Sequence, residues 1–83
     1  MPNIIKLENS IGRDLQICVE PFLDYIDWDA GKVAEIELNR ISDAYQDDLN
    51  IAFTEQGPVI YWCRQFEMKI FIDKELKYSQ RLD

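Results

Sequence analysis

The chain has 83 residues, of which 47% are hydrophobic and 30% are charged, and its 16 acidic and 9 basic residues give a net charge of −7. This length and composition are typical of one small globular domain, so we take residues 1–83 as a single domain and exclude a disordered chain. The acidic balance argues against direct binding to nucleic acid or to an anionic membrane surface, because both require a basic face.

The sequence contains no segment suited to cross a membrane as a helix. Its longest apolar run is the five residues from Val59 to Cys63, whereas a transmembrane helix needs about 20. The N-terminal residues Met1–Lys6 lack the basic region and apolar stretch that mark a secretory signal. We therefore expect a cytoplasmic protein.

The negative charge is concentrated in the middle of the chain. Residues 20–55 hold ten acidic and two basic residues, a sum of −8, whereas residues 1–19 sum to zero and residues 56–83 to +1. A surface of one sign steers a partner of the opposite sign. The pattern favours a basic protein partner, and the alternative is that the acidity only keeps a small protein in solution.

A hydrophobic period of two runs through most of the chain and predicts strands with one buried face. In the first such segment, Leu15, Ile17 and Val19 share a face. Turn signals such as Asp29-Ala30-Gly31 and Asp73-Lys74 separate the segments. The pattern predicts about seven short strands, at Leu15–Glu20, Tyr25–Trp28, Lys32–Leu38, Leu49–Phe53, Val59–Cys63, Met68–Ile72 and Glu75–Tyr78.

Two of these strands have distinctive patterns. Val59–Cys63 is apolar on both faces, which is typical of a central strand, although the pattern does not say which face meets the core. In the preceding strand, Leu49, Ile51 and Phe53 are expected to point inward.

The predicted fold is an all-β, single-domain antiparallel sandwich or small barrel. Ser42 and Asp43 are good helix N-caps, so one short helical turn is expected near residues 42–48. The alternative is an α+β fold with a C-terminal helix over Gln65–Arg81. The β-rich run Ile70-Phe71-Ile72 favours the strands.

Most of the parts that catalysis needs are missing. The chain has no histidine to act as a general base, and its three glycines are scattered rather than gathered in a phosphate-binding loop. Cys18 and Cys63 are expected to be buried thiols, with a disulfide as the alternative. We therefore expect no catalytic residue, no cofactor and no metal site.

Ten aromatic residues are too many to bury fully in a domain of this size, so some should lie at the surface. An exposed tyrosine or tryptophan beside an acidic residue is a good anchor for a protein interface. The expected partner-binding residues combine such aromatics with the acidic central segment: Asp24, Tyr25, Asp27, Asp29, Asp43, Tyr45, Asp47 and Asp48.

The run Leu15–Phe22, followed by Gly31 and Glu35-Ile36, resembles small bacterial all-β proteins of unknown function. Their pattern is an apolar strand, a Glu-Pro-aromatic step, an acidic stretch, a glycine turn and an alternating strand. The segment Ile70–Leu76 looks like the closing hairpin of such chains. In size and acidity the chain is also similar to the immunity proteins of bacterial toxin systems. These resemblances imply a small β domain without catalytic residues.

The leading functional hypothesis is a cytoplasmic immunity or inhibitor protein that neutralises a basic toxin, such as a nuclease, through its acidic segment. One alternative is a small-ligand-binding β-barrel with a shallow aromatic pocket. Another is a structural subunit or homodimer that pairs through an open sheet edge.

Overall fold

A computed structural model describes residues 3–20, 23–40, 50–61 and 66–82. Within these ranges the chain forms eight strands: β1 (Asn3–Glu8), β2 (Leu15–Glu20), β3 (Asp24–Trp28), β4 (Val33–Arg40), β5 (Asn50–Thr54), β6 (Gly57–Tyr61), β7 (Phe66–Ile72) and β8 (Glu75–Leu82).

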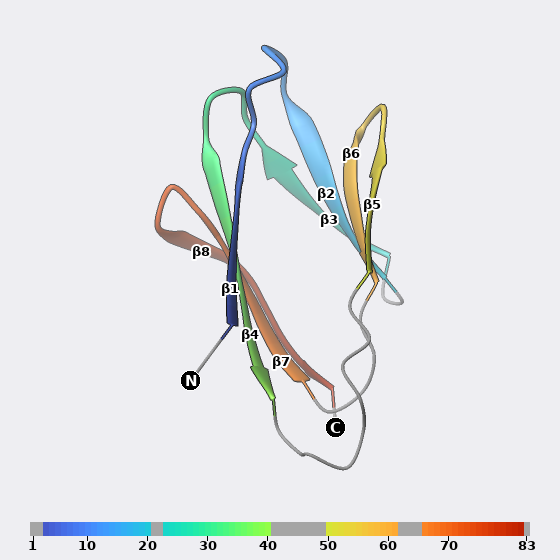
Figure 1. The fold of residues 1–83 in the computed structure, drawn as a ribbon, viewed down its shortest axis with the longest axis vertical. Coiled ribbons are helices and arrows are strands. Elements are labelled where there is room, and N and C mark those ends of the chain that lie inside the picture. The colour runs from blue at the N-terminus through green and yellow to red at the C-terminus, as the bar shows by residue number, and fades with distance from the viewer. Residues whose placement is uncertain (1–2, 21–22, 41–49, 62–65, 83) are drawn as a thin grey trace.

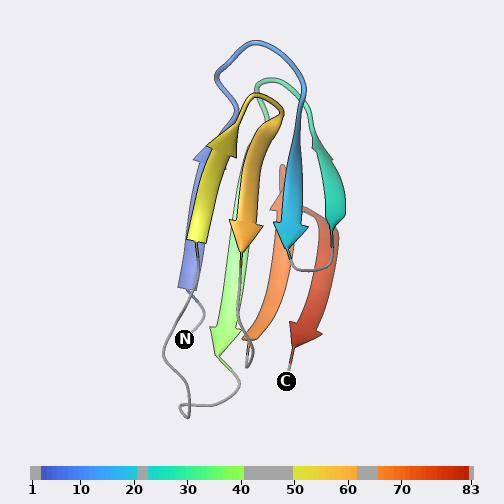
Figure 2. The ribbon, with the colours of Figure 1, turned by 90° about the vertical axis from the view of Figure 1, so that its right-hand side faces the viewer.

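The strands form two four-stranded sheets that pack face to face (Figures 1 and 2). We call them the first sheet, in the order β1-β4-β7-β8, and the second sheet, in the order β3-β2-β6-β5. Neighbouring strands in the described part of the chain run antiparallel except β2 and β6, which are parallel. Each sheet ends in two edge strands, so this part of the chain forms a sandwich and no closed barrel.

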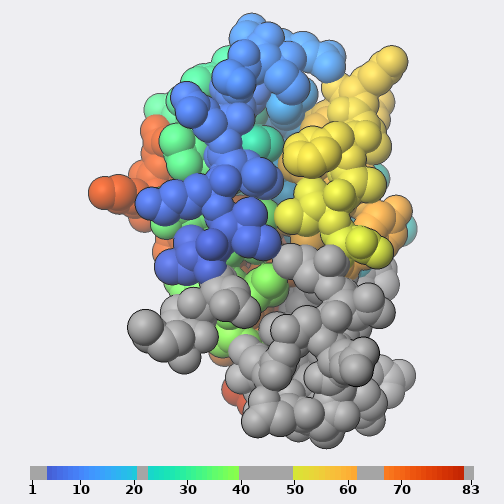
Figure 3. Space-filling model, viewed as in Figure 1, coloured from blue at the N-terminus to red at the C-terminus, as the bar shows by residue number. Residues whose placement is uncertain are grey.

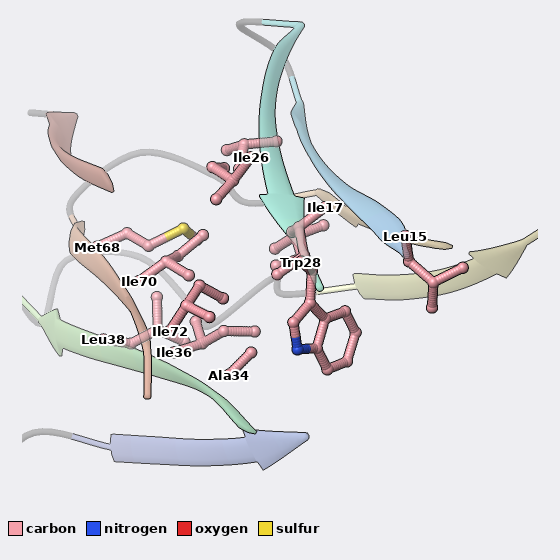
Figure 4. Close-up of a cluster of buried hydrophobic side chains, with 12 residues drawn as sticks. Leu15, Ile17, Ile26, Trp28, Ala34, Ile36, Leu38, Met68, Ile70 and Ile72 are labelled. Atoms are coloured by element: carbon pink, nitrogen blue, oxygen red, sulfur yellow. The ribbon is translucent and has the colours of Figure 1, made fainter. Parts of the chain in front are cut away.

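The core lies between the two sheets (Figure 4). The second sheet contributes Leu15, Ile17, Ile26 and Trp28, and the first sheet faces them with residues of β4 and β7. The Trp28 indole N–H donates to the carbonyl of Lys32 at 2.9 Å, so this large ring is buried without an unpaired polar group. Burial of each large apolar side chain contributes about 1.5–3 kcal/mol to folding.

The prediction of an all-β fold is confirmed, and the alternative of a C-terminal helix is wrong. Residues 66–82 form the β7–β8 hairpin instead of a helix. Met68, Ile70 and Ile72 of β7 all enter the core, which requires a period of two. The expected helical turn at residues 42–48 lies outside the described residues.

Strand β1, which pairs with β4, is not among the strands predicted from the sequence. Ile5 and Leu7 pack against the core, while Lys6 and Glu8 are exposed, so a period-two signal was present. The exposed Ile4, on the same side as Lys6, makes that alternation harder to recognise.

The prediction that Phe53 points into the core is wrong. The Phe53 side chain is 72% exposed and is not part of the core. Ile51, two residues earlier on β5, does pack against the core. Phe53 lies near the end of an edge strand, where no further strand in the described part of the chain covers it. The edges formed by β1 and β5 face the viewer in Figure 3.

The turn predicted at Asp73-Lys74 joins β7 to β8. Both residues have positive φ angles, 48° and 68°, as a two-residue hairpin turn of type I′ requires. The Asp73 carboxylate accepts a hydrogen bond from the Val33 N–H at 3.0 Å and pairs with Lys32 at 3.1 Å. These two contacts lower the pKa of Asp73 and attach the hairpin to the start of β4.

No helix in the described ranges has the length and apolar character that crossing a membrane demands.

Candidate protein-binding face

The outer face of the second sheet is the surface with the features of a binding site. Figure 2 looks onto it. Strand register places Tyr25 beside Cys18, Cys18 beside Val59 and Val59 beside Ala52, which makes a row across all four strands. We call this surface the tyrosine face and define it by the outward residues Gln16, Cys18, Glu20, Tyr25, Asp27, Ala52, Thr54, Val59 and Tyr61.

The tyrosine face is concave because small side chains lie between larger ones. Cys18 is buried and Val59 half-buried, whereas Tyr25 is 62% exposed and Tyr61 is 48% exposed. A shallow groove of about 500 Å³ runs over this surface, and both tyrosines line it. Two exposed aromatic rings beside a shallow groove are the usual anchors of a protein interface.

The two sheets differ in charge. The strands of the second sheet contain three acidic residues and no lysine or arginine, whereas those of the first sheet contain five acidic and five basic residues. Two of the three acids, Glu20 and Asp27, lie on the tyrosine face. This face therefore carries negative charge that no basic residue of its own sheet offsets.

The central acidic segment of the sequence is divided between the sheets. Glu35 and Glu37 of β4 belong to the first sheet, where they lie opposite Lys6 of β1 and Lys69 of β7, respectively. Opposite charges at directly paired positions stabilise a sheet. These two glutamates are therefore part of a mixed, balanced surface, and the unbalanced acidity lies on the other sheet.

Hydrogen bonds tie the polar groups of the tyrosine face to one another. The Gln16 side-chain amide donates to the Asp27 carboxylate at 3.2 Å, and the Cys18 thiol lies 3.9 Å from the Glu20 carboxylate. Burial, reinforced by the negative charge of Glu20, raises the pKa of the Cys18 thiol. Cys18 is therefore a protonated, free thiol and a poor nucleophile at neutral pH.

The expected partner-binding residues of β3 fall on different sides of the strand. Tyr25 and Asp27 lie on the tyrosine face, and Asp29 follows in the turn after β3. Asp24 is exposed on the opposite side, where its carboxylate accepts a hydrogen bond from the Tyr78 hydroxyl at 2.9 Å. The other expected residues, Asp43, Tyr45, Asp47 and Asp48, lie outside the described residues.

Sequence reasoning did not select Cys18, Glu20, Val59 or Tyr61 as part of a site. The apolar pattern of β6 does not specify its buried face, and the structure shows Ile60 buried with Val59 and Tyr61 turned outward. The signal was the alternation of β2: once Ile17 and Val19 face the core, Cys18 and Glu20 must face away from it. The expected thiol at Cys63 lies outside the described residues.

Across the described ranges, no three histidine, cysteine or acidic side chains are grouped as a metal ion would need. Comparisons with protein-family models, with curated proteins and with solved structures found no match to this chain.

The bond between Tyr78 of the first sheet and Asp24 of the second joins the two sheets at their β8 and β3 edges. Burial and the Asp24 carboxylate raise the pKa of Tyr78 far above its usual range. Tyrosine in the unfolded chain ionises near pH 10. The stabilisation from this pKa shift is therefore fully present below pH ~10 and is lost as the pH rises further.

Tyr78→Phe should lower the free energy of unfolding by about 0.5–1 kcal/mol at neutral pH, because one partly exposed hydrogen bond is lost. Above pH ~10 the wild type should lose stability more steeply than this variant, which has no hydroxyl to ionise at this position. Urea unfolding at a series of alkaline pH values measures both effects. Equal slopes for the two proteins would show that Tyr78 ionises alike in the folded and unfolded chains.

Proposed function

We propose that this protein is a cytoplasmic immunity or inhibitor protein, which binds a basic toxin domain through the tyrosine face and blocks its activity. The carrying observation is the charge contrast between the sheets: three acids and no base in one, an equal number of each in the other. Because two of the three acids, Glu20 and Asp27, lie on the tyrosine face, this face carries a net negative charge, which favours a cationic partner and speeds its approach.

The two tyrosines give the proposed interface its anchors. Tyr25 and Tyr61 are exposed on the same face as the acidic residues, at opposite sides of the groove. Large rings in the centre of an interface supply most of its short-range binding energy, while charges mainly set the rate of encounter. An inhibitor needs no catalytic group of its own, and the buried, protonated Cys18 supports a binding role for this face.

The class of function is tested with the product of the adjacent gene, which the proposal requires to be a basic protein. Purified wild-type protein should bind it tightly at low salt and suppress its activity at equimolar ratio. Tight binding without loss of the partner's activity would support a binding role but contradict the inhibitor function. Absence of binding at low salt would remove the proposed function.

Tyr61→Ala should weaken that binding about tenfold, mainly through faster dissociation, because truncation removes an exposed ring from the proposed interface. Phe53→Ala is the control, since Phe53 is an aromatic residue of the same sheet that is more exposed than Tyr61 and lies off the tyrosine face. Dissociation rates from surface plasmon resonance give the comparison. A larger effect from Phe53→Ala would move the interface to the β5 edge.

A further inference from the structure

The outer edge of β3 presents unpaired backbone groups. The N–H of Gln16 donates to the carbonyl of Gln56 at 2.8 Å, so this residue's backbone is turned toward the β6 side of β2 and away from β3. In an antiparallel pair, directly opposed residues alternate between hydrogen-bonded and non-hydrogen-bonded positions. Asp27, opposite Gln16, is thus at a non-hydrogen-bonded position, and so is Tyr25, two residues earlier.

The backbone N–H and C=O groups of Tyr25 and Asp27 therefore point to the free edge of the second sheet. No other strand in the described part of the chain pairs with β3 on that side. In Figure 2, β3 and β8 lie at the same side of the sandwich. The free edge of β3 therefore lies on the same side of the sandwich as β8, the edge strand of the first sheet.

A groove of about 610 Å³ follows this edge. The β3 strand and the β7–β8 hairpin form its walls, and both contribute an isoleucine, Ile26 and Ile72, to its lining. Each of these isoleucines is 7% exposed. The groove thus has two largely buried isoleucines among mainly charged lining residues, and the backbone donors and acceptors of β3 lie along one wall.

The charges around this groove are only partly balanced. Its two lysines are already paired, Lys32 with Asp73 at 3.1 Å and Lys77 with Glu75 at 3.4 Å. Asp27 and Asp29 also line the groove, and no ion pair with a described lysine or arginine neutralises them. The wall formed by β3 therefore favours a cationic occupant.

We propose that an extended segment of the basic partner pairs with the free edge of β3 and adds a fifth strand to the second sheet. Its side chains would alternate. Side chains of the added strand that lie opposite Ile26 would point into the groove and should be apolar. Side chains opposite Tyr25 and Asp27 would point to the outer face of the sheet and should be lysine or arginine. The identity of the partner rests on the proposed function, whereas the pairing itself depends only on the edge, the groove and the charges.

The test uses a synthetic peptide of alternating valine and lysine as the probe and the full chain as the target. Amide hydrogen exchange, followed by NMR, should be fast at Tyr25 and Asp27 in the free protein. Saturating peptide should slow exchange at both positions about tenfold or more, because their N–H groups become hydrogen-bonded. A peptide with glutamate in place of lysine should have no such effect.

A peptide N-methylated at the amides that would pair with β3 should not slow exchange either. Asp27→Asn with Asp29→Asn should weaken binding of the lysine peptide and preserve the exchange pattern at saturation. Glu35→Gln with Glu37→Gln, the matched charge change on the other sheet, should leave that binding unchanged.

Several results would overturn the pairing. The first is a peptide complex in which the amides of Tyr25 and Asp27 still exchange fast. The second is equal slowing of exchange by the N-methylated peptide, and the third is no binding of the lysine peptide. Slow exchange at both residues in the protein alone, together with dimers in sedimentation, would show that the β3 edge pairs with a second copy of this chain instead. If the neighbouring gene product still binds while the peptide fails, only this inference falls and the proposed function stands.

Discussion

Gly57→Ala is expected to lower the free energy of unfolding by about 3–5 kcal/mol. For a domain of this size, such a loss is enough to unfold a large fraction of the molecules. A Cβ at this position would lie 2.1 Å from the Gln16 carbonyl oxygen, and the φ angle of Gly57 is +133°. The obstructing atom belongs to the backbone of β2, so no side-chain movement can relieve the clash. Gln16 and Gly57 lie two residues before the pair Cys18–Val59, where the parallel pairing of β2 with β6 begins, so the clash would push these strands apart at that end.

Gly31→Ala is the matched control. Gly31 also has a positive φ, +80°, but no atom lies within 4 Å of the added Cβ. Its cost should be limited to the backbone conformation, about 1 kcal/mol. Denaturant midpoints of the two variants separate the steric cost from the conformational one. Similar midpoints would mean that β6 does not approach β2 as closely as the structure shows.

Asn9→Asp is expected to lower the free energy of unfolding by about 2–4 kcal/mol at neutral pH, although the two side chains have almost the same shape. Asn9 is only 2% exposed, and its amide nitrogen donates to the carbonyls of Arg13 at 2.9 Å and Trp28 at 3.1 Å. Its backbone pairs with Lys32 and Gly31. This residue thereby holds the β1–β2 loop against the turn between β3 and β4.

A carboxylate at position 9 would face two carbonyl oxygens, which raises its pKa in the folded state. Aspartate in the unfolded chain ionises near pH 4. The cost of the substitution should therefore be smallest below that pH and grow as the pH rises through the raised folded-state pKa. Thermal unfolding of Asn9→Asp and wild type between pH ~3 and ~7 measures the difference. A difference that does not change with pH would contradict the assigned hydrogen bonds.

Much of the fold follows from local sequence patterns. The alternation in β2 predicts that Leu15, Ile17 and Val19 share the buried face, because a strand with one buried face has only one way to arrange its side chains. The turn at Asp73-Lys74 was also predicted from its local sequence. β1 was missed because the exposed Ile4 obscures its period of two.

The site was predicted only in part, because it depends on how distant strands pair. Tyr25 and Asp27 were expected from their neighbourhood in sequence. Cys18 and Tyr61 join them through the pairing of β2 with β3 and with β6, which no local pattern specifies. Pairing of β4 in the other sheet, likewise, places Glu35 and Glu37 opposite lysines.

Matched charge reversal tests the tyrosine face most directly. Asp27→Lys changes the charge on this face, and Glu35→Lys makes the same change on the other sheet. We predict that Asp27→Lys slows association with the proposed basic partner about tenfold or more at low salt and weakens its salt dependence. Glu35→Lys should have a clearly smaller effect in the same stopped-flow experiment. Equal association rates for the two variants, or a larger effect from Glu35→Lys, would contradict binding through the tyrosine face.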